Sequence, residues 1–380
     1  MLFTYQYVPH SMEKMQGFID FIFNEVWAKA PQKGDYDALA LFAPCPDLQE
    51  VIQSFHYSPL KSANFFLTGI QTIYELFRPL APEQIHQLIN WYRINNEIEK
   101  VCQNKPGFQP VCYAQIEVQF AALAEEFKKF FGGLYNQNFL GLKALREKIG
   151  NIDICYDQFM MVNNQGICPF CGINAMKGHL QNTSREAYDH YLPKAIYPFN
   201  SINFQNLAPA CHECNSSYKL AKDPLFKNTH QREASNQRKS FYSYAEDSPQ
   251  IDIHIEFLSP DINSLTPEQI QILFGPNQYQ EELETWQDVY GIQERYKAKC
   301  LMQNDGKWWL EQIIAVKGRG GSVTPQAYLQ IKYMEAEEKP FADNNFLRKP
   351  FLEACEKLGL FNQAPQAELR GSIQSESVNV

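Results

Sequence analysis

Two pairs of cysteines provide the clearest chemistry in this 380-residue chain. Each pair has two residues between its thiols: Cys168 with Cys171, and Cys211 with Cys214. Two such pairs can complete a tetrahedral thiolate shell around Zn²⁺, and four thiolates leave no coordination position open for a substrate. The spacing therefore predicts a structural zinc site. A redox role is disfavoured, because a redox dithiol usually consists of a single pair.

The other potential ligands have simpler interpretations. His179 and His212 could replace a thiol, but both are interpreted as surface histidines. The remaining cysteines occur singly, as buried apolar residues do, whereas disulfide scaffolds are short and dense in cysteine. These six are Cys45, Cys102, Cys112, Cys155, Cys300 and Cys355.

The segment between and after the cysteine pairs carries polar residues in a distinctive order. Asp189 and His190 are adjacent, and Asn206 lies shortly before the second pair. Asn215 follows the second pair directly, and Lys219 comes four residues later. Taken singly, each of these residues is typical of an ordinary surface or core position. Their interleaving with both cysteine pairs is hard to assign to chance.

In this order of residues, the segment 168–224 resembles the HNH (His-Me finger) endonuclease family. The resemblance covers a minority of the chain, but its combined elements are specific. It implies a ββα-metal unit in which two strands and a helix are held by zinc. It also implies an enzyme that hydrolyses phosphodiester bonds and leaves 5′-phosphate and 3′-hydroxyl ends.

The resemblance implies a role for each catalytic residue. His190 is the expected general base, since a histidine with an ordinary pKa near 6.5 is largely neutral at working pH. Asn206 is expected to accept a hydrogen bond from one ring nitrogen of His190, so that the other nitrogen faces water. Asp189, adjacent on a strand, points to the opposite face and can reach a metal ion.

A catalytic cation and phosphate contacts complete the expected site. Asp189 and Asn215 would hold one Mg²⁺ or Mn²⁺ ion, which binds through few protein oxygens. Many family members have histidine in place of Asn215, and those can use softer metals. Contacts with nucleic acid are expected from Lys219, Lys194 and Lys222, with Tyr218 a further candidate.

The flanking regions are expected to be mainly helical, because apolar residues recur there at helical spacing. The expected helices cover Ser11–Ala30, a segment from Pro82, and Ala114–Phe131, which should stop at Gly132 and Gly133. Later helices are expected from Thr266, over Glu281–Tyr296 and Lys307–Val316, and from Thr324. A strand is expected at Ile251–Phe257, and a hinge or loop at Gly318–Gly321.

These elements predict an α+β protein with helical regions around a central zinc-stabilised unit. The expected domains are an N-terminal helical domain at 1–150, the nuclease unit at 151–228, a mainly helical region at 229–362, and a disordered tail at 363–380. The start of the chain lacks the features of a signal peptide, and no apolar run suits a membrane span. We therefore expect a cytoplasmic protein with no membrane partner.

The net charge of −9 disfavours a protein that binds nucleic acid over its whole surface, but it leaves room for a local basic site. Residues 215–240 carry six basic and two acidic side chains, a pattern that also fits a solvated surface. The expected function is an HNH endonuclease acting on double-stranded DNA, as a restriction or anti-phage defence effector with a partner subunit or a second copy. The alternative is a non-catalytic zinc-stabilised module that binds nucleic acid or protein.

Overall fold

The structure is a computed structural model that describes residues 1–180, 184–228, 231–316 and 323–361. These residues form two compact units: unit 1 is 1–250 together with 277–291, and unit 2 is 251–276 together with the described residues after 291. Helices combined with two small antiparallel sheets confirm the α+β class. The expected loop at Gly318–Gly321 and the expected tail at 363–380 lie outside the described residues.

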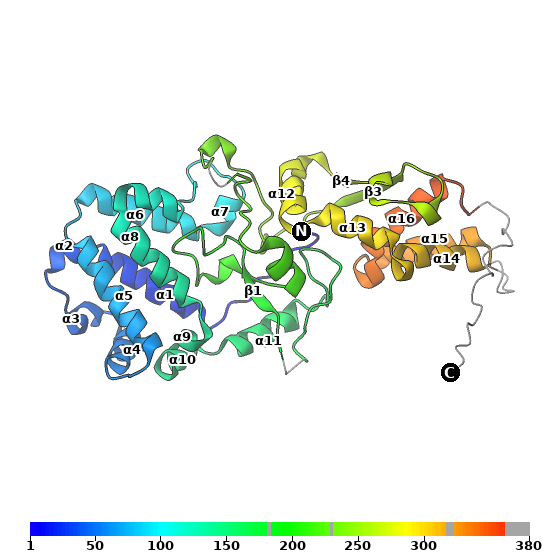
Figure 1. Cartoon of the computed structure of the whole chain (residues 1–380). Coiled ribbons are helices and arrows are strands. Elements are labelled where there is room, and N and C mark those ends of the chain that lie inside the picture. The colour runs from blue at the N-terminus through cyan, green and yellow to red at the C-terminus, as the bar shows by residue number, and fades with distance from the viewer. Residues whose placement is uncertain (181–183, 229–230, 317–322, 362–380) are drawn as a thin grey trace, which may run out of the picture. The chain divides into compact units, whose positions relative to one another are not determined.

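The N-terminal part of unit 1 is helical, as Figure 1 shows in blue to green. Helix α1 continues directly into a π-helical segment, Ile22–Trp27. The helices are α1 (Glu13–Phe21), α2 (Ala30–Lys33), α3 (Ala38–Phe42), α4 (Pro46–His56), α5 (Lys61–Phe77), α6 (Pro82–Asn96), α7 (Ile98–Cys102), α8 (Tyr113–Leu134), α9 (Gln137–Leu140), α10 (Lys143–Ile149) and α11 (Ile152–Val162).

Close packing of α5 and α8 explains why α8 runs past its expected end. A Cβ atom at Gly133 would lie 2.4 Å from the ring of Phe65, so a larger residue there would displace that ring from the contact between the helices. Gly132 and Gly133 therefore lie within α8, which ends at Leu134 rather than at Phe131. The glycine pair that predicted a helix end instead allows the two helices to pack closely.

A two-stranded sheet follows in unit 1. Strand β1 (Ala187–His190) pairs antiparallel with β2 (Leu207–Ala210), so that His190 lies opposite Leu207 and Asp189 opposite Ala208. The second strand begins at Leu207, directly after a 3₁₀ turn at Phe204–Asn206. After β2 comes a π-helical turn, Cys214–Lys219.

The connection between β1 and β2 is part of the helical core. The ring of Phe199 is fully buried, with its centroid 5.2 Å from those of Phe127 and Phe131. Its backbone φ is +80°, a conformation that costs a non-glycine residue energy and persists only where the surroundings enforce it. The side chain of Asn95 donates to the carbonyl of Pro198 at 3.1 Å. The N-terminal helices and the strands therefore share one core.

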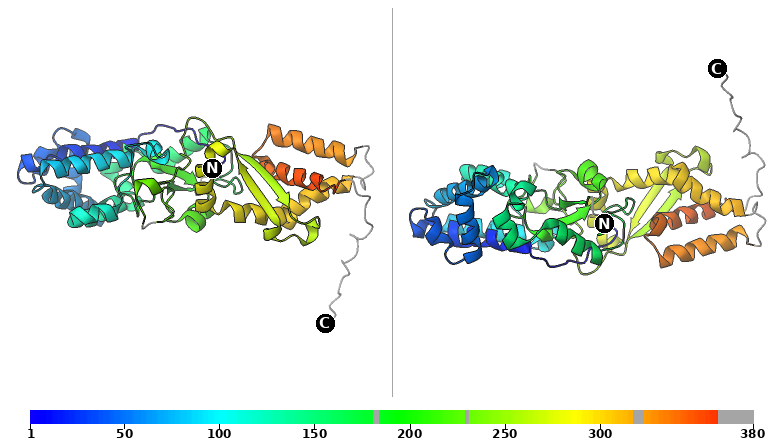
Figure 2. Two further views of the ribbon diagram at one scale, coloured as in Figure 1. Left: turned by 90° about the horizontal axis from the view of Figure 1, so that it is seen from above. Right: turned by 90° about the horizontal axis from the view of Figure 1, so that it is seen from below.

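Unit 2 contains a hairpin and helices. The expected strand is confirmed as β3 (Asp252–Phe257), which pairs with β4 (Ile270–Gly275). The prediction of a helix from Thr266 is wrong, because a single 3₁₀ turn there leads directly into β4. The residues after the turn form a strand, since the Ile270 and Ile272 side chains share one buried face of the hairpin. Helices α13 (Ile292–Leu301), α14 (Trp308–Ile314), α15 (Pro325–Glu338) and α16 (Asn345–Lys357) complete the unit. Figure 2 shows α16 between the hairpin and α15.

The helix expected at Glu281–Tyr296 is two helices that belong to different units. Helix α12 (Gln280–Tyr290) lies in unit 1, and α13 begins at Ile292 in unit 2. Between them, Gly291 has a φ of +60°, which is typical of the residue that ends a helix in the left-handed conformation. Across the described ranges, no helix combines the length and apolar character needed to cross a membrane.

Candidate functional site

The two cysteine pairs come together as the sequence predicts. The Sγ atoms of Cys168, Cys171, Cys211 and Cys214 lie within 4.8 Å of one another, and all four residues are buried. Burial raises the pKa of the Cys168 thiol well above its ordinary value, and the neighbouring cysteines add to that shift. Such a cluster ionises readily only when a cation shares its charge, so these residues fit a tetrahedral metal such as zinc.

Polar groups around the cluster support thiolate ligands. The amide of Asn174 donates to Cys211 Sγ at 3.3 Å, and the backbone N–H of Ile173 donates to Cys171 Sγ at 3.5 Å. Hydrogen bonds of this kind stabilise the charged form of sulfur. All ten cysteines are described and none forms a disulfide; of the isolated six, five are buried as predicted, whereas Cys45 is half-buried.

Helix α12 covers the first cysteine pair. The indole of Trp286 donates to the carbonyl of Phe170 at 2.6 Å, and the ring of Tyr290 stacks on Phe170 at 5.0 Å. Phe170 lies between Cys168 and Cys171, so α12 is packed against the turn that carries two of the four thiols. The sequence offered no sign of this contact, because more than a hundred residues separate its partners.

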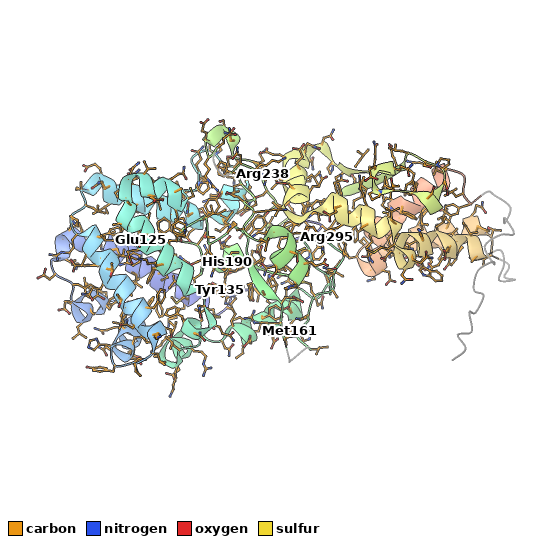
Figure 3. All side chains as sticks on the ribbon, viewed as in Figure 1. Glu125, Tyr135, Met161, His190, Arg238 and Arg295 are labelled. Carbon is orange, nitrogen blue, oxygen red and sulfur yellow. The ribbon has the colours of Figure 1, made fainter. Side chains whose placement is uncertain are left out.

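The ring of His190 is held by a backbone carbonyl. Its Nε2 lies 2.9 Å from the carbonyl oxygen of Ser201, and a carbonyl can only accept, so Nε2 carries the proton and Nδ1 has a free lone pair. Burial lowers the pKa of His190 to about 3, and the nearby Lys194 contributes to the shift. The ring of Tyr135 packs edge-on at 4.8 Å, and Figure 3 labels both residues. The imidazole of His190 is therefore neutral, and its orientation is fixed by Ser201 and Tyr135.

Asn206 has partners other than the expected one. Its side-chain oxygen accepts from the backbone N–H of Leu192 at 2.8 Å, and its amide nitrogen donates to the carbonyl of Leu192 at 3.0 Å. The orientation of the His190 ring, expected from Asn206, comes from Ser201 instead. Asn206 is fully buried and fixes the chain that follows β1. Its role is therefore to hold the connection between the strands.

Asp189 and Lys219 form a buried ion pair. Lys219 Nζ donates to Asp189 Oδ1 at 3.0 Å and to the carbonyl of His190 at 2.7 Å, and the Lys219 side chain has no exposed surface. Burial raises the pKa of Asp189, and Lys219 opposes that shift. The second carboxylate oxygen, Oδ2, is buried and accepts no hydrogen bond from the described residues. Lys219 thus binds this carboxylate rather than presenting its charge to phosphate.

Asn215 lies on the π-helical turn that ends at Lys219, and its side chain is half-buried. The hydrogen bonds of the described residues do not include one between Asn215 and Asp189. The structure therefore brings Lys219 into contact with the Asp189 carboxylate and the backbone carbonyl of His190, while the role expected of Asn215 stays a prediction.

The other basic residues expected to contact nucleic acid also have internal partners. Lys194 Nζ lies 3.2 Å from the carbonyl of Gly132 at the end of α8. Lys222 Nζ lies 3.1 Å from the carbonyl of Asp288 near the end of α12. Lysines at helix carboxyl ends stabilise the unpaired carbonyls there. Both contacts make these lysines parts of the scaffold, although Lys222 remains exposed.

Sequence reasoning missed two residues that contact His190 and a third that lies close to one of them. Ser201 holds the imidazole through its carbonyl, Tyr135 packs against the ring, and Arg185 is close enough to Tyr135 to oppose the rise in that tyrosine's pKa caused by burial. Backbone carbonyls have no sequence signature, and Tyr135 comes from the end of α8, far from the cysteine pairs. Only the shared core brings these residues together.

Comparisons of the chain with protein-family models, with curated proteins and with solved structures found no match.

Proposed function

We propose that unit 1 carries a metal-dependent endonuclease site of the HNH type that hydrolyses phosphodiester bonds of double-stranded DNA. One observation carries the proposal. On the β1–β2 hairpin next to the four-cysteine cluster, a neutral His190 with a free Nδ1 lone pair adjoins Asp189, whose buried Oδ2 lacks a partner. A base and a carboxylate with an unused oxygen are what metal-assisted phosphodiester hydrolysis requires.

His190 acts as the general base. Because Ser201 fixes Nε2–H, Nδ1 is the atom that takes the proton from the attacking water. The edge of Tyr135 restricts rotation of the imidazole, and Asn206 holds the connection from which Ser201 projects. Each of these residues positions the base without contributing a proton itself.

The types of donor at these two residues also suit a hard divalent cation. Asp189 through Oδ2 and Asn215 through its amide oxygen would hold Mg²⁺ or Mn²⁺, since carboxylate and amide oxygens suit these ions. When bound, the ion supplies positive charge that stabilises the phosphate and the departing 3′-oxygen. Lys219 would then keep Asp189 ionised by pairing with its other oxygen.

A plasmid-cleavage assay with Mg²⁺ or Mn²⁺ tests the proposal. Wild type should nick or cut duplex DNA, and His190→Ala should lower the rate by about 10²–10⁴-fold, the usual contribution of a general base. His56→Ala removes an exposed histidine of α4 and serves as the matched control, with an unchanged rate. Equal cleavage by wild type and His190→Ala, or none by either at high protein concentration, would contradict the proposal.

A second candidate is a zinc-stabilised binding module without catalysis. It is favoured by the buried Lys219 ammonium, which already neutralises Asp189 where the enzyme would bind a cation. A permanent lysine in place of a metal ion would keep the fold and abolish hydrolysis. The same cleavage assay decides between the two, because only the enzyme depends on His190.

A further inference from the structure

A pocket lies directly behind the side chain that packs on His190. Tyr135 lines it, together with the start of α11 and parts of α9 and α10. Its volume of about 190 Å³ is below the ~300–1,000 Å³ of typical small-molecule sites, so it suits one chemical group rather than a whole cofactor. Since the ring centroids of Tyr135 and His190 are 4.8 Å apart, the pocket is one side chain away from the proposed base.

The charge in the pocket is positive. Arg146 and Arg185 line it, against one carboxylate, Asp153. Arg185 Nε pairs with Asp153 at 2.7 Å, which neutralises the single acid. Arg146 is exposed, and the ion pairs of the described residues include none for it. One uncompensated guanidinium therefore faces the pocket.

The backbone around the pocket adds to its preference for anions. Helix α11 has 11 residues, and its first turn, Ile152 and Asp153, lines the pocket with the N-cap residue Asn151. The side-chain oxygen of Asn151 already accepts a hydrogen bond from the Asp153 N–H, and the Asp153 carboxylate lies in the first turn, so the helix adds only the partial positive charge of its other amino-terminal N–H groups. Guanidinium groups and helix amino ends are both common ligands of phosphate.

We propose that this pocket is an anion subsite in which Arg146 and Arg185 bind a backbone phosphate of the nucleic acid strand, next to the phosphodiester at His190. The inference rests on the proposed nuclease function and extends it to the substrate-binding surface. It also assigns the phosphate contact to Arg146 and Arg185 rather than to Lys194 and Lys222, whose ammonium groups bind helix ends.

Binding measured without turnover tests the subsite. All variants carry His190→Ala in the full chain, no Mg²⁺ or Mn²⁺ is added, and a fluorescently labelled DNA duplex is titrated at several salt concentrations. Arg146→Ala should weaken binding several-fold and reduce the slope of log affinity against log salt by about 1, the value for one lost phosphate contact. Arg146→Lys keeps the charge and should retain the slope.

Lys143→Ala is the matched control. Lys143 lies on the same helix, α10, has a highly exposed side chain and is outside the pocket, so its loss removes the same charge from a neighbouring position. The slope should stay unchanged. Equal effects of Arg146→Ala and Lys143→Ala, or no binding of duplex by the parent protein, would overturn the inference. Thermal melting of each variant shows whether it is folded.

Two further outcomes separate this inference from other possibilities. If a mononucleotide or inorganic phosphate binds through Arg146 while the salt slope for duplex is independent of that residue, the pocket serves a free phosphate compound and the inference is wrong. If Arg146 controls duplex binding but wild type does not cleave DNA, the nuclease proposal fails and the phosphate subsite stands as part of a binding module.

Discussion

At the scale of single residues, the pair of Asp189 and Lys219 decides what the site can do. A lysine with no exposed surface is rare unless it is paired, and its partner here retains one unused oxygen. Lys219 can therefore keep the Asp189 carboxylate ionised so that it binds a divalent cation, or it can replace that cation permanently. These two alternatives predict different responses of protein stability to added divalent cations.

Lys219→Met is expected to destabilise unit 1 strongly, because it leaves the Asp189 carboxylate buried without its counter-charge. Breaking a buried ion pair in this way costs about 3–5 kcal/mol of unfolding free energy. If Asp189 binds a divalent cation, added Mg²⁺ or Mn²⁺ should restore part of that loss. Chemical denaturation of the variant with and without the ion gives the measurement.

The double variant Asp189→Asn with Lys219→Met provides the control. It removes both charges together, so it should be more stable than Lys219→Met and should not respond to divalent cations. A single variant that is equally insensitive to Mg²⁺ and Mn²⁺ would argue that Asp189 binds no metal, which favours the non-catalytic module.

The candidate residues differ in how well sequence reasoning predicted them. The four cysteines were predicted correctly as a cluster, since the short spacing within each pair already fixes two thiols on one turn. The partners of Lys219 and Asn206 were not predicted, because they depend on burial: Lys219 binds groups of β1, and Asn206 binds the backbone of Leu192 after that strand. Side-chain type indicates which chemistry is available, whereas tertiary contacts decide which atoms it reaches.

At the scale of elements, the connection between β1 and β2 links the catalytic base to the helical core. Its Phe199 is inserted between aromatic rings of the helices, and the hydroxyl of Ser201 donates to the carbonyl of Phe131 at 2.6 Å. The carbonyl of that same serine holds His190. The position of the imidazole thus depends on packing in helices that precede it by more than fifty residues.

Phe199→Ala should therefore reduce both stability and cleavage. Removing a fully buried phenylalanine costs about 3–5 kcal/mol. Cleavage per folded molecule should also fall, because Ser201 loses the packing that places its carbonyl. Denaturation and the plasmid assay, run below the unfolding transition, measure the two effects.

Phe65→Ala is a suitable comparison, since Phe65 packs on α8 at Gly133 but lies outside the β1–β2 connection. It should lower stability without lowering cleavage per folded molecule. If both variants affect cleavage equally, the connection has no special part in positioning His190.

Sequence patterns predicted elements well where apolar spacing was regular and less well where other effects competed. The helix from Pro82 and the strand before Phe257 were confirmed. The helix expected from Thr266 was not, because its capping residues were followed by residues that pair as a strand. Gly133 did not end α8, because the contact with Phe65 outweighs the poor helix propensity of glycine.

At the scale of the whole molecule, the two units should differ in their dependence on metal. The four-cysteine cluster lies in unit 1, whereas unit 2 has its own aromatic core, in which Phe351 packs with Phe257 and Trp309. Binding energy at a structural zinc site contributes directly to folding. Loss of the metal should therefore affect unit 1 selectively.

Purified protein should contain about one zinc ion per chain. Removing it with a chelator should increase hydrogen exchange in residues 168–180 and 184–219 and in α12, while leaving exchange in α16 unchanged. Cys211→Ser should reproduce this pattern and lower the metal content. Protein that is free of zinc and shows unchanged exchange near the cysteines would contradict a structural metal site.

The chain crosses between the two units three times, after residues 250, 276 and 291. Neither unit is thus a continuous stretch of sequence. During synthesis on the ribosome, which proceeds from the amino end, the cysteines emerge before Trp286, whose helix covers the turn at Phe170. That turn stays uncovered while the intervening hairpin is being made. A nascent chain truncated at residue 250 would carry all four thiols but would lack the helix that covers Phe170. The turn at Phe170 would then be open to solvent, its two thiols would be open to oxidation, and the truncated chain would be prone to aggregation.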